Sequence, residues 1–198
     1  DELKEPHLVQ LFNRFATYNG SSPFKTPGMM TLIQHLEQEY GTFVSEKGMI
    51  NISNSIYDLA KRNGVKFEFN KLVNEIVVKN NKVVGVKVNN TVIESDFVVS
   101  NMDIVPTYKK LLKKSYQPKK VLNQERSSSA LIFYWGIKKT FKNLELHNIL
   151  FSNNYKKEFD SIFELGTISD DPTIYINITS KDVDSDAPKE SENWFVMI

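Results

Sequence analysis

The sequence predicts an α+β fold, in which helices and strands occupy largely separate stretches of the chain. Residues 8–63 place apolar side chains three or four positions apart, as on one face of a helix. From Val65 the spacing changes to every second residue, which is typical of half-buried strands. We therefore expect helices first, a group of hairpin-connected strands next, and a mixed sheet-plus-helices region over the last third.

Composition limits the function. The 198 residues are 40% apolar and 25% charged, enough for one large or two small soluble domains. A net charge of +1 with interspersed signs argues against nucleic-acid binding. The absence of cysteine excludes disulfides, thiol catalysis and cysteine-ligated zinc. The longest apolar run, residues 130–135, is too short to span a bilayer, and the acidic residues 1–10 do not resemble a signal peptide, so we expect a cytoplasmic protein.

Three helices are predicted in the first third. An apolar stripe over residues 8–18 predicts a helix that ends before Gly20 and Pro23. A second helix follows Pro27 and stops at Gly41, and a third covers residues 50–63.

Strands are predicted next, at residues 65–69, 71–79 and 84–88, with a further strand over 94–99. The pairs Asn80-Asn81 and Asn89-Asn90 are suitable hairpin turns, because asparagine tolerates positive φ. A helix feeding a first strand, a three-stranded meander and a returning strand is the expected order.

The rest of the chain mixes element types. A short helix at 108–112 precedes a basic, proline-interrupted connection at 113–124, which we expect to cross between domains. The closing third predicts strands at 130–137, 149–152, 173–179 and 194–198 and a helix at 155–163.

No metal site is predicted. Asp182, Asp184 and Asp186 imitate the start of a calcium loop, but Ala187 and Asn193 stand where glycine and glutamate are needed. The three histidines are isolated from one another, and there is no G-x-S-x-G nucleophile turn.

Several segments of the sequence have a specific residue pattern and occur in a specific order: residues 12–23 (FNRFATYNGSSP), 64–103, 127–163, Asp170-Asp171-Pro172 and Ala187-Pro188. Together they resemble the carotenoid (phytoene-type) desaturase family of FAD-dependent oxidoreductases. The resemblance implies that the chain is an internal piece of a longer enzyme, inactive by itself.

The resemblance also implies a domain plan and a cofactor. Residues 1–62 and 104–198 would form a substrate domain, interrupted at 63–103 by part of a FAD-binding (Rossmann-like) domain. The main chain at Val73, in a Val-x-x-Ile motif with Ile76, would contact the adenine end of FAD. This sequence contains no phosphate-binding G-x-G-x-x-G turn. Its eight glycines are too far apart for one, at positions 20, 28, 41, 48, 64, 85, 136 and 166.

For activity, the resemblance implies desaturation or isomerisation of a carotenoid-like polyene such as phytoene, with hydride passing to the flavin. No catalytic residue is assigned. Arg14 and Tyr18 are the polar candidates for orienting the substrate, and Phe133 and Trp135 are candidate contacts with it. Aromatic residues that could line an apolar tunnel are Phe12, Phe15, Tyr18, Phe24, Phe133, Tyr134, Trp135, Phe159 and Tyr175. A lipid-dissolved substrate implies peripheral membrane association.

Two other readings stay open. One is an amine-oxidase-like or retinol-saturase-like flavoenzyme acting on a different apolar substrate. The other is a non-catalytic lipid-binding module with the same fold; a G-x-G-x-x-G turn upstream of these residues would favour an enzyme, and its absence would favour the module.

Overall fold

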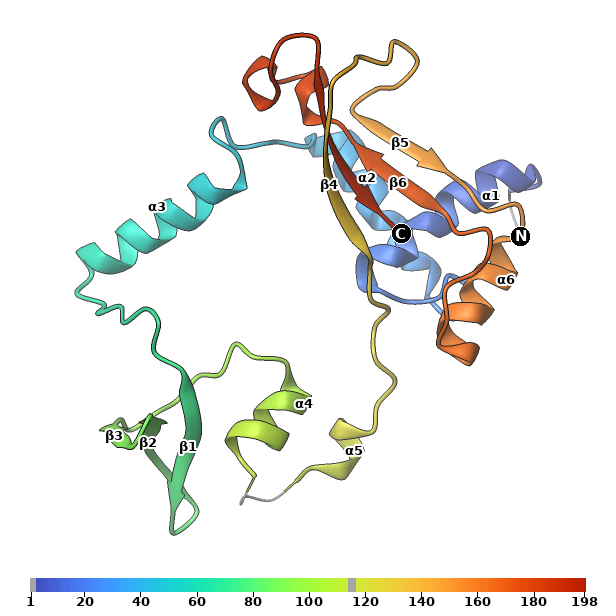
Figure 1. The fold of residues 1–198 in the computed structure, drawn as a ribbon. Helices are drawn as coiled ribbons and strands as arrows, with labels where there is room; N and C mark the ends of the chain where they lie inside the picture. The colour runs from blue at the N-terminus through green and yellow to red at the C-terminus, as the bar shows by residue number, and fades with distance from the viewer. Residues whose placement is uncertain (1–2, 114–116) are drawn as a thin grey trace. The chain divides into compact units, whose positions relative to one another are not determined.

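The computed structural model describes residues 3–113 and 117–198, and it has the predicted α+β class (Figure 1). The chain forms two compact units. Asp1–Thr42 and Arg126–Ile198 make one, which we call the four-stranded unit, and Phe43–Glu125 make the other, the three-stranded unit. Within the described parts of the chain, no helix has both the length and the apolar content needed to cross a bilayer.

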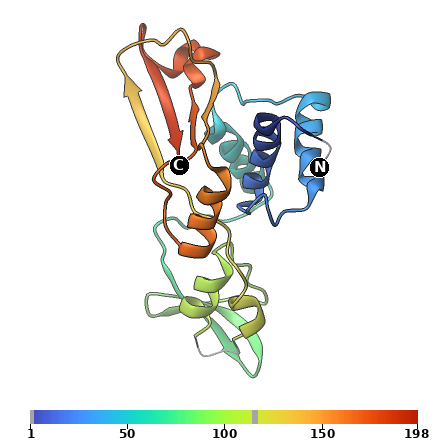
Figure 2. The same cartoon turned by 90° about the vertical axis from the view of Figure 1, so that its right-hand side faces the viewer.

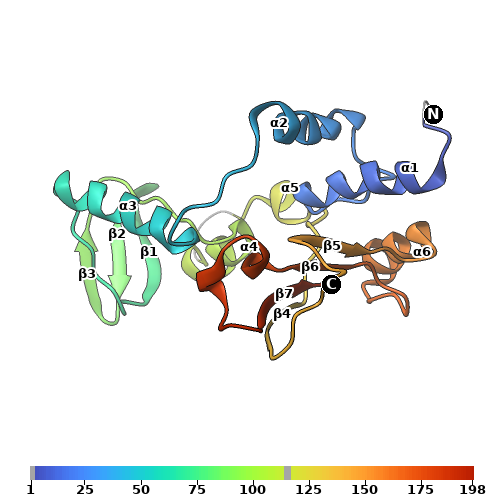
Figure 3. The same cartoon turned by 90° about the horizontal axis from the view of Figure 1, so that it is seen from above.

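The four-stranded unit is built on an antiparallel sheet of order β4-β7-β6-β5 (Figure 3). Its strands are β4 (Ile132–Ile137), β5 (His147–Leu150), β6 (Ile174–Asn177) and β7 (Glu192–Met197). Its helical segments are α1 (Pro6–Asn13), η1 (Arg14–Asn19), η2 (Gly28–Thr31), α2 (Leu32–Tyr40), α6 (Tyr155–Asp160), η4 (Ser161–Leu165), η5 (Thr179–Lys181) and η6 (Asp184–Asp186). Apart from η5 and η6, which the sequence does not predict, these elements lie where the sequence predicts them, within a few residues at their ends.

One face of this sheet forms the core of the unit. Ile176 and Val196 lie opposite each other in the β6–β7 ladder, and Ile178 follows with no exposed surface. Phe133, Leu144, Ile174 and Trp194 pack around these three side chains. Because side chains alternate along a strand, the neighbouring residues on β4, β6 and β7 point to the opposite face.

Helix ends in this unit follow local sequence signals. Glu5 caps α1 by accepting the Leu8 N–H at 2.8 Å, and Pro6 occupies the first turn. This hydrogen bond, with that from His7, lowers the pKa of the Glu5 carboxyl. The chain continues from α1 into η1, which ends at Gly20 in the left-handed region with φ 59°.

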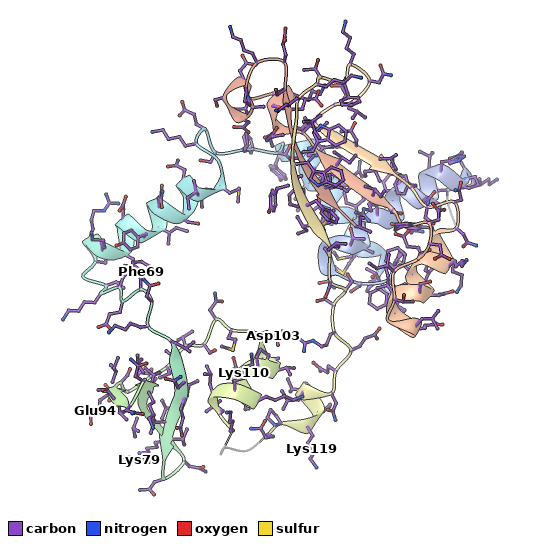
Figure 4. All side chains as sticks on the ribbon, in the orientation of Figure 1. Phe69, Lys79, Glu94, Asp103, Lys110 and Lys119 are labelled. Atoms are coloured by element: carbon purple, nitrogen blue, oxygen red, sulfur yellow. The ribbon has the colours of Figure 1, made fainter. Side chains whose placement is uncertain are left out.

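The three-stranded unit contains an antiparallel meander of order β1-β2-β3 (Figure 2). Its elements are α3 (Met49–Arg62), β1 (Val73–Lys79), β2 (Lys82–Val88), β3 (Thr91–Glu94), α4 (Ile104–Pro106), the π-helical η3 (Thr107–Leu111) and α5 (Lys119–Leu122). Figure 4 marks Lys79 at the end of β1 and Glu94 at the end of β3. Asn80, Asn81 and Asn89 have positive φ, as the hairpin prediction requires.

Two predicted strands of this unit are wrong. Residues 65–69 lack strand pairing, and of the strand predicted over 94–99 only Glu94, the last residue of β3, pairs in the sheet, with one further hydrogen bond from the Ser95 N–H to the Val84 carbonyl. Phe67 and Phe69 pack instead against Tyr57 of α3, with ring centroids 4.4 and 6.0 Å away. Of the predicted connection over 113–124, residues 114–116 lie outside the described residues, and α5 occupies its second half.

The boundaries of the two compact units differ from the predicted boundaries of the substrate and FAD segments. The predicted divisions fall after residues 62 and 103, whereas the compact units divide after Thr42 and Glu125. Helix α3 belongs with the meander through the Tyr57 contacts, and η3 packs on β1. The assignment of substrate and FAD binding to particular segments stays a prediction.

Candidate functional site

The sheet face opposite the core carries a row of aromatic side chains, which we call the aromatic face: Tyr134, Phe195, Tyr175 and His147. Tyr134 and Phe195 are cross-strand partners with ring centroids 5.4 Å apart. The ring of Tyr175 lies 6.5 Å from Phe195, and that of His147 stacks on Tyr175 at 6.0 Å. Tyr134 remains 80% exposed. The strand register therefore assembles an aromatic surface on which Tyr134 and His147 are exposed and Tyr175 and Phe195 are half-buried.

An open depression of about 460 Å³ lies at one end of this surface. This volume is within the range of small-molecule sites in proteins. Gly136 forms part of its wall, and a Cβ built on this glycine would meet no atom within 4 Å. The full lining consists of Tyr134, Trp135, Gly136, Asn177, Thr179, Asn193, Trp194 and Phe195.

Three contacts fix α1 and η1 against this sheet. Gln10 donates to the carbonyl of Ser152 beyond the end of β5 at 2.9 Å. The carbonyl of Gly20 accepts the Ser128 N–H at 2.9 Å, just before β4. A Cβ at Gly20 would lie 2.7 Å from the Ser127 Cβ, so this approach requires glycine. Arg14 and Tyr18 of η1 are thereby held at the sheet.

Arg14 lies beside two tyrosine hydroxyls. Burial raises the pKa of the Tyr155 hydroxyl, and the adjacent Arg14 guanidinium opposes that rise. Burial likewise raises the pKa of Tyr175, and its hydrogen bond to Asn177 and the charge of Arg14 oppose it. The Tyr175 hydroxyl also bonds the Nδ1 atom of His147 at 2.8 Å. A positive charge therefore sits next to the aromatic face.

Tyr18 is held by a carboxylate of α2. Its hydroxyl donates to Oε1 of Glu37 at 2.7 Å, and this bond, with partial burial, raises the pKa of Tyr18 to about 12. The phenol is thus neutral over the physiological range and acts as a donor to Glu37.

The structure brings some of the predicted substrate residues together and separates others. Arg14 and Tyr18 neighbour the aromatic face through Tyr175. Phe133 points to the opposite face and packs against the core, with Trp135 at 5.5 Å from it. Trp135 nevertheless contributes to the wall of the depression. On this strand Tyr134, one of the predicted tunnel residues, occupies the aromatic face.

Sequence reasoning missed Tyr155, His147 and Phe195 as site residues. His147 and Phe195 are brought together by the pairing of β5, β6 and β7, which sets residues far apart in the sequence side by side, whereas Tyr155 comes from α6. In the sequence alone, His147 is an isolated histidine, and no neighbouring motif marks it as a site residue.

Val73, predicted to contact FAD, begins β1, which is an edge strand of the meander. A register shift follows it, and Asn74 uses its side chain to accept the Asn89 N–H at 2.9 Å. Within the described residues no strand pairs with the outer edge of β1, so main-chain groups there can bond a ligand. This arrangement fits an adenine contact. It does not include a turn for the pyrophosphate.

Residues 1–136 match the family described as flavin containing amine oxidoreductase. The chain belongs to this family, and the cofactor of the family is FAD.

Curated relatives refine this assignment. A 1-hydroxycarotenoid 3,4-desaturase of Flavobacterium sp. (strain P99-3) is 56% identical over 197 residues, which are 100% of this chain and 40% of that protein. A 4,4'-diapolycopene oxygenase of Methylomonas sp is 33% identical over 96% of the chain and 39% of the relative. A phytoene desaturase of Neurospora crassa is 32% identical over 99% of the chain and 35% of the relative. The chain spans about 40% of the length of such relatives, and the predicted resemblance to carotenoid desaturases is confirmed.

Proposed function

We propose that the intact protein is an FAD-dependent oxidoreductase that desaturates a carotenoid-like polyene, and that its substrate carries a hydroxyl group at one end. The observation that carries this proposal is the 56% identity, over the whole chain, to a protein named as a 1-hydroxycarotenoid 3,4-desaturase. The aromatic face supports it, because a conjugated polyene binds well to tyrosine and phenylalanine rings. The substrate would thus be a hydroxylated relative of the phytoene expected from the sequence.

The bound flavin supplies the hydride acceptor for such a reaction. The role of the described residues is to hold and orient the polyene. Tyr134 and Phe195 offer an apolar surface, and Gly136 leaves room beside them. An extended substrate lying there would exclude water from these strands, which favours a fixed geometry at the reacting carbons.

Turnover by the intact flavoprotein tests the proposal. The purified protein, incubated with a 1-hydroxylated acyclic polyene in detergent micelles, should yield a product with two fewer hydrogens and absorption at longer wavelength. Chromatography with mass detection measures this product. Turnover of a water-soluble amine without conversion of any polyene would overturn the proposal in favour of an amine oxidase. A product that gains oxygen would instead indicate the chemistry named for the Methylomonas relative.

Gly136→Val tests whether the depression holds substrate. The valine side chain has space and suits a strand, so folding should be retained while the depression is filled. Polyene affinity should fall about tenfold or more. Gly28→Ala is the matched control, because its Cβ also meets no neighbour but lies outside the depression. Equal affinities in both variants would exclude the depression as the polyene site.

Val73→Ala tests the cofactor contact. If the main chain reads the adenine, FAD affinity should stay within a few-fold while the free energy of unfolding falls by roughly 1 kcal/mol through lost burial of the half-buried side chain. Equilibrium dialysis against FAD measures the affinity of the folded protein. Loss of FAD binding without loss of stability would show that the side chain, not the backbone, is recognised.

A polyene is dissolved in lipid, so we propose a cytoplasmic protein that binds membranes peripherally to reach it. Reversible sedimentation with liposomes should show this binding. Full recovery of an active protein in the supernatant, with substrate supplied in liposomes, would argue against it.

A further inference from the structure

The two compact units carry opposite net charges, which the near-neutral chain as a whole conceals. The three-stranded unit, residues 43–125, contains 14 basic and 8 acidic residues, so its formal charge is +6. The four-stranded unit contains 11 basic and 16 acidic residues, so its formal charge is −5. A charge of this size on a small unit attracts ions and surfaces of the opposite sign.

The positive excess of the three-stranded unit comes from one stretch of chain. Residues 104–124 contain six lysines and no acidic residue, whereas the rest of the unit has eight residues of each sign. The described lysines of this stretch, which are all exposed and which we call the lysine surface, are Lys109, Lys110, Lys113, Lys119 and Lys120. No described carboxylate forms an ion pair with any of them. Their charge is therefore available to a partner.

Helix η3 presents two of these lysines on its outer side. Thr107 and Leu111 of this helix are buried, and the helix packs on β1. Lys109 and Lys110 lie between these two buried positions and are exposed. The packing of η3 on the meander thus directs both ammonium groups to solvent.

The fold brings α5 to the end of η3. Gln117, just before α5, donates through Nε2 to the carbonyls of Tyr108 and Leu112, at 3.4 and 3.0 Å. These two bonds hold the start of α5, and with it Lys119, near the last turn of η3. Figure 4 labels Lys110 on η3 and Lys119 at the start of α5. The lysine pairs of the two helices therefore belong to neighbouring parts of one unit.

The composition of this stretch favours a lipid headgroup layer as its partner. It contains no arginine, the residue best suited to bidentate recognition of single phosphates in nucleic acids. Lysine instead offers a point charge on a long apolar stem, which can lie along an apolar surface while its ammonium stays in water. Ile104 and Val121 of the same stretch remain 46% and 38% exposed. Basic residues with exposed apolar neighbours are typical of proteins that bind at the membrane interface.

We propose that the lysine surface binds the anionic headgroups of a lipid bilayer and so brings the protein to the membrane in which its polyene is dissolved. The inference rests on the proposed function for the polyene, and adds the protein surface and the charge of the lipid. Each lysine near an anionic bilayer strengthens binding about fivefold. Five lysines are thus enough for reversible attachment.

Co-sedimentation of the intact flavoprotein with vesicles tests the proposal. One set of vesicles contains phosphatidylcholine alone, and the other contains phosphatidylcholine mixed with phosphatidylglycerol. Wild type should bind the anionic vesicles at least about tenfold more tightly than the neutral ones. The difference should shrink as the salt concentration rises, because salt screens charges that are exposed to solvent.

Two double variants locate the binding surface. Lys109→Gln with Lys110→Gln, and Lys119→Gln with Lys120→Gln, each remove two charges. Each should weaken binding to the anionic vesicles about 20-fold and leave binding to the neutral vesicles unchanged. All four side chains are exposed and make no ion pair with a described group, so folding should be retained. Denaturant unfolding checks this.

Lys79→Gln with Lys82→Gln is the matched control. These two lysines are exposed cross-strand partners at the β1–β2 turn of the same unit. Figure 4 shows Lys79 apart from both Lys110 and Lys119. The control removes as much charge from the unit as each test variant does, but it should weaken binding to anionic vesicles less than about threefold.

The outcomes are distinct. Equal binding of neutral and anionic vesicles by wild type would overturn the inference, and so would an equal loss in the control variant. Tighter binding of duplex DNA than of anionic vesicles at the same salt concentration would also overturn it, in favour of a nucleic-acid partner. Lysine-dependent binding of anionic vesicles without conversion of any polyene would uphold the inference and refute the proposed reaction. Conversion of the polyene in micelles without binding to anionic vesicles would do the reverse.

Discussion

The two sheets of this chain are stabilised in different ways. The four-stranded sheet joins segments far apart in the sequence, since β4 pairs with β7 and β7 pairs with β6. One face of this sheet buries Ile176, Ile178 and Val196. The three-stranded sheet joins neighbours through tight turns, and β3 is exposed along its length. Side-chain burial contributes to both sheets, since the second buries Ile76 and Val88, and tight turns and a close backbone approach at Gly85 are added features of the second. Tyr134 on the aromatic face stays exposed because the core of its sheet lies on the other side.

The largest expected effect is in the core of the four-stranded unit. Ile178 is fully buried, so Ile178→Ala should lower the free energy of unfolding by about 4 kcal/mol, through lost burial and the cavity that remains. Ile93→Ala on β3, where the side chain is 44% exposed, is the matched control and should cost less than about 1.5 kcal/mol. Denaturant unfolding measures both. Equal costs would show that burial of the side chain does not determine the cost.

Gly85 of β2 tests the close backbone approach in the three-stranded sheet. Its φ is 147°, and an added Cβ would lie 2.1 Å from the Ile93 carbonyl oxygen and 2.9 Å from the Glu94 Cα. Gly85→Ala should therefore force β2 and β3 apart, at a cost of about 3 kcal/mol.

Hydrogen exchange locates the damage of Gly85→Ala. Amides of β2 and β3 should lose protection while those of β6 and β7 keep it. Gly28→Ala, where a Cβ meets no neighbour, should leave exchange unchanged in both sheets. Uniform loss of protection across the chain would show that the units unfold together.

The same contrast explains how far sequence reasoning reached. Helix ends at Gly20 and Gly41 and the turns at Asn80-Asn81 and Asn89 were predictable, because each depends on the conformational preference of a single residue. The strand predicted at residues 65–69 is wrong. Alternation of apolar residues indicates which face of a strand would be buried, but it does not indicate which other strand would pair with it.

The site was predictable only in part. Arg14 and Tyr18 stood out as polar residues in an aromatic segment, and η1 does bring them to the sheet. The choice of Phe133 over Tyr134 for a surface contact could not be made from the sequence, because both belong to one apolar run. The pairing of β4 with β7 decides it, by turning Phe133 towards Val196.

A buried ion pair gives the four-stranded unit a pH dependence. Glu192 is 3% exposed and accepts from Lys181 at 2.8 Å, from the Phe141 N–H and from the Trp194 indole. Burial raises the pKa of this carboxyl, but these hydrogen bonds together outweigh burial and hold its pKa below the ordinary value.

A lowered folded-state pKa means that the Glu192 contribution is present above the unfolded pKa and is lost as the pH falls through the folded one. Glu192→Gln should cost about 2 kcal/mol at neutral pH, and the variant should lose less stability than wild type between about pH 5 and pH 3. Denaturant unfolding at several pH values measures this. Parallel pH curves for the two proteins would show that Glu192 does not contribute as proposed.

The smallest effect is expected at Tyr18, which lies on the surface of the same unit. Tyr18→Phe removes the hydrogen bond to Glu37, and since Tyr18 is largely exposed the loss should stay below about 1 kcal/mol. Because the pKa of Tyr18 is raised, its contribution to stability changes with pH in the opposite direction from that of Glu192. The contribution is complete below the ordinary tyrosine pKa of about 10 and disappears as the pH rises through about 12. The difference in phenolate absorbance between wild type and Tyr18→Phe should titrate near 12. A midpoint near 10 would mean that Glu37 does not hold the hydroxyl in solution, and that η1 is free to move at the edge of the aromatic face. Tyr40→Phe, which removes an exposed hydroxyl without a hydrogen-bond partner in the described chain, supplies the reference for the stability change.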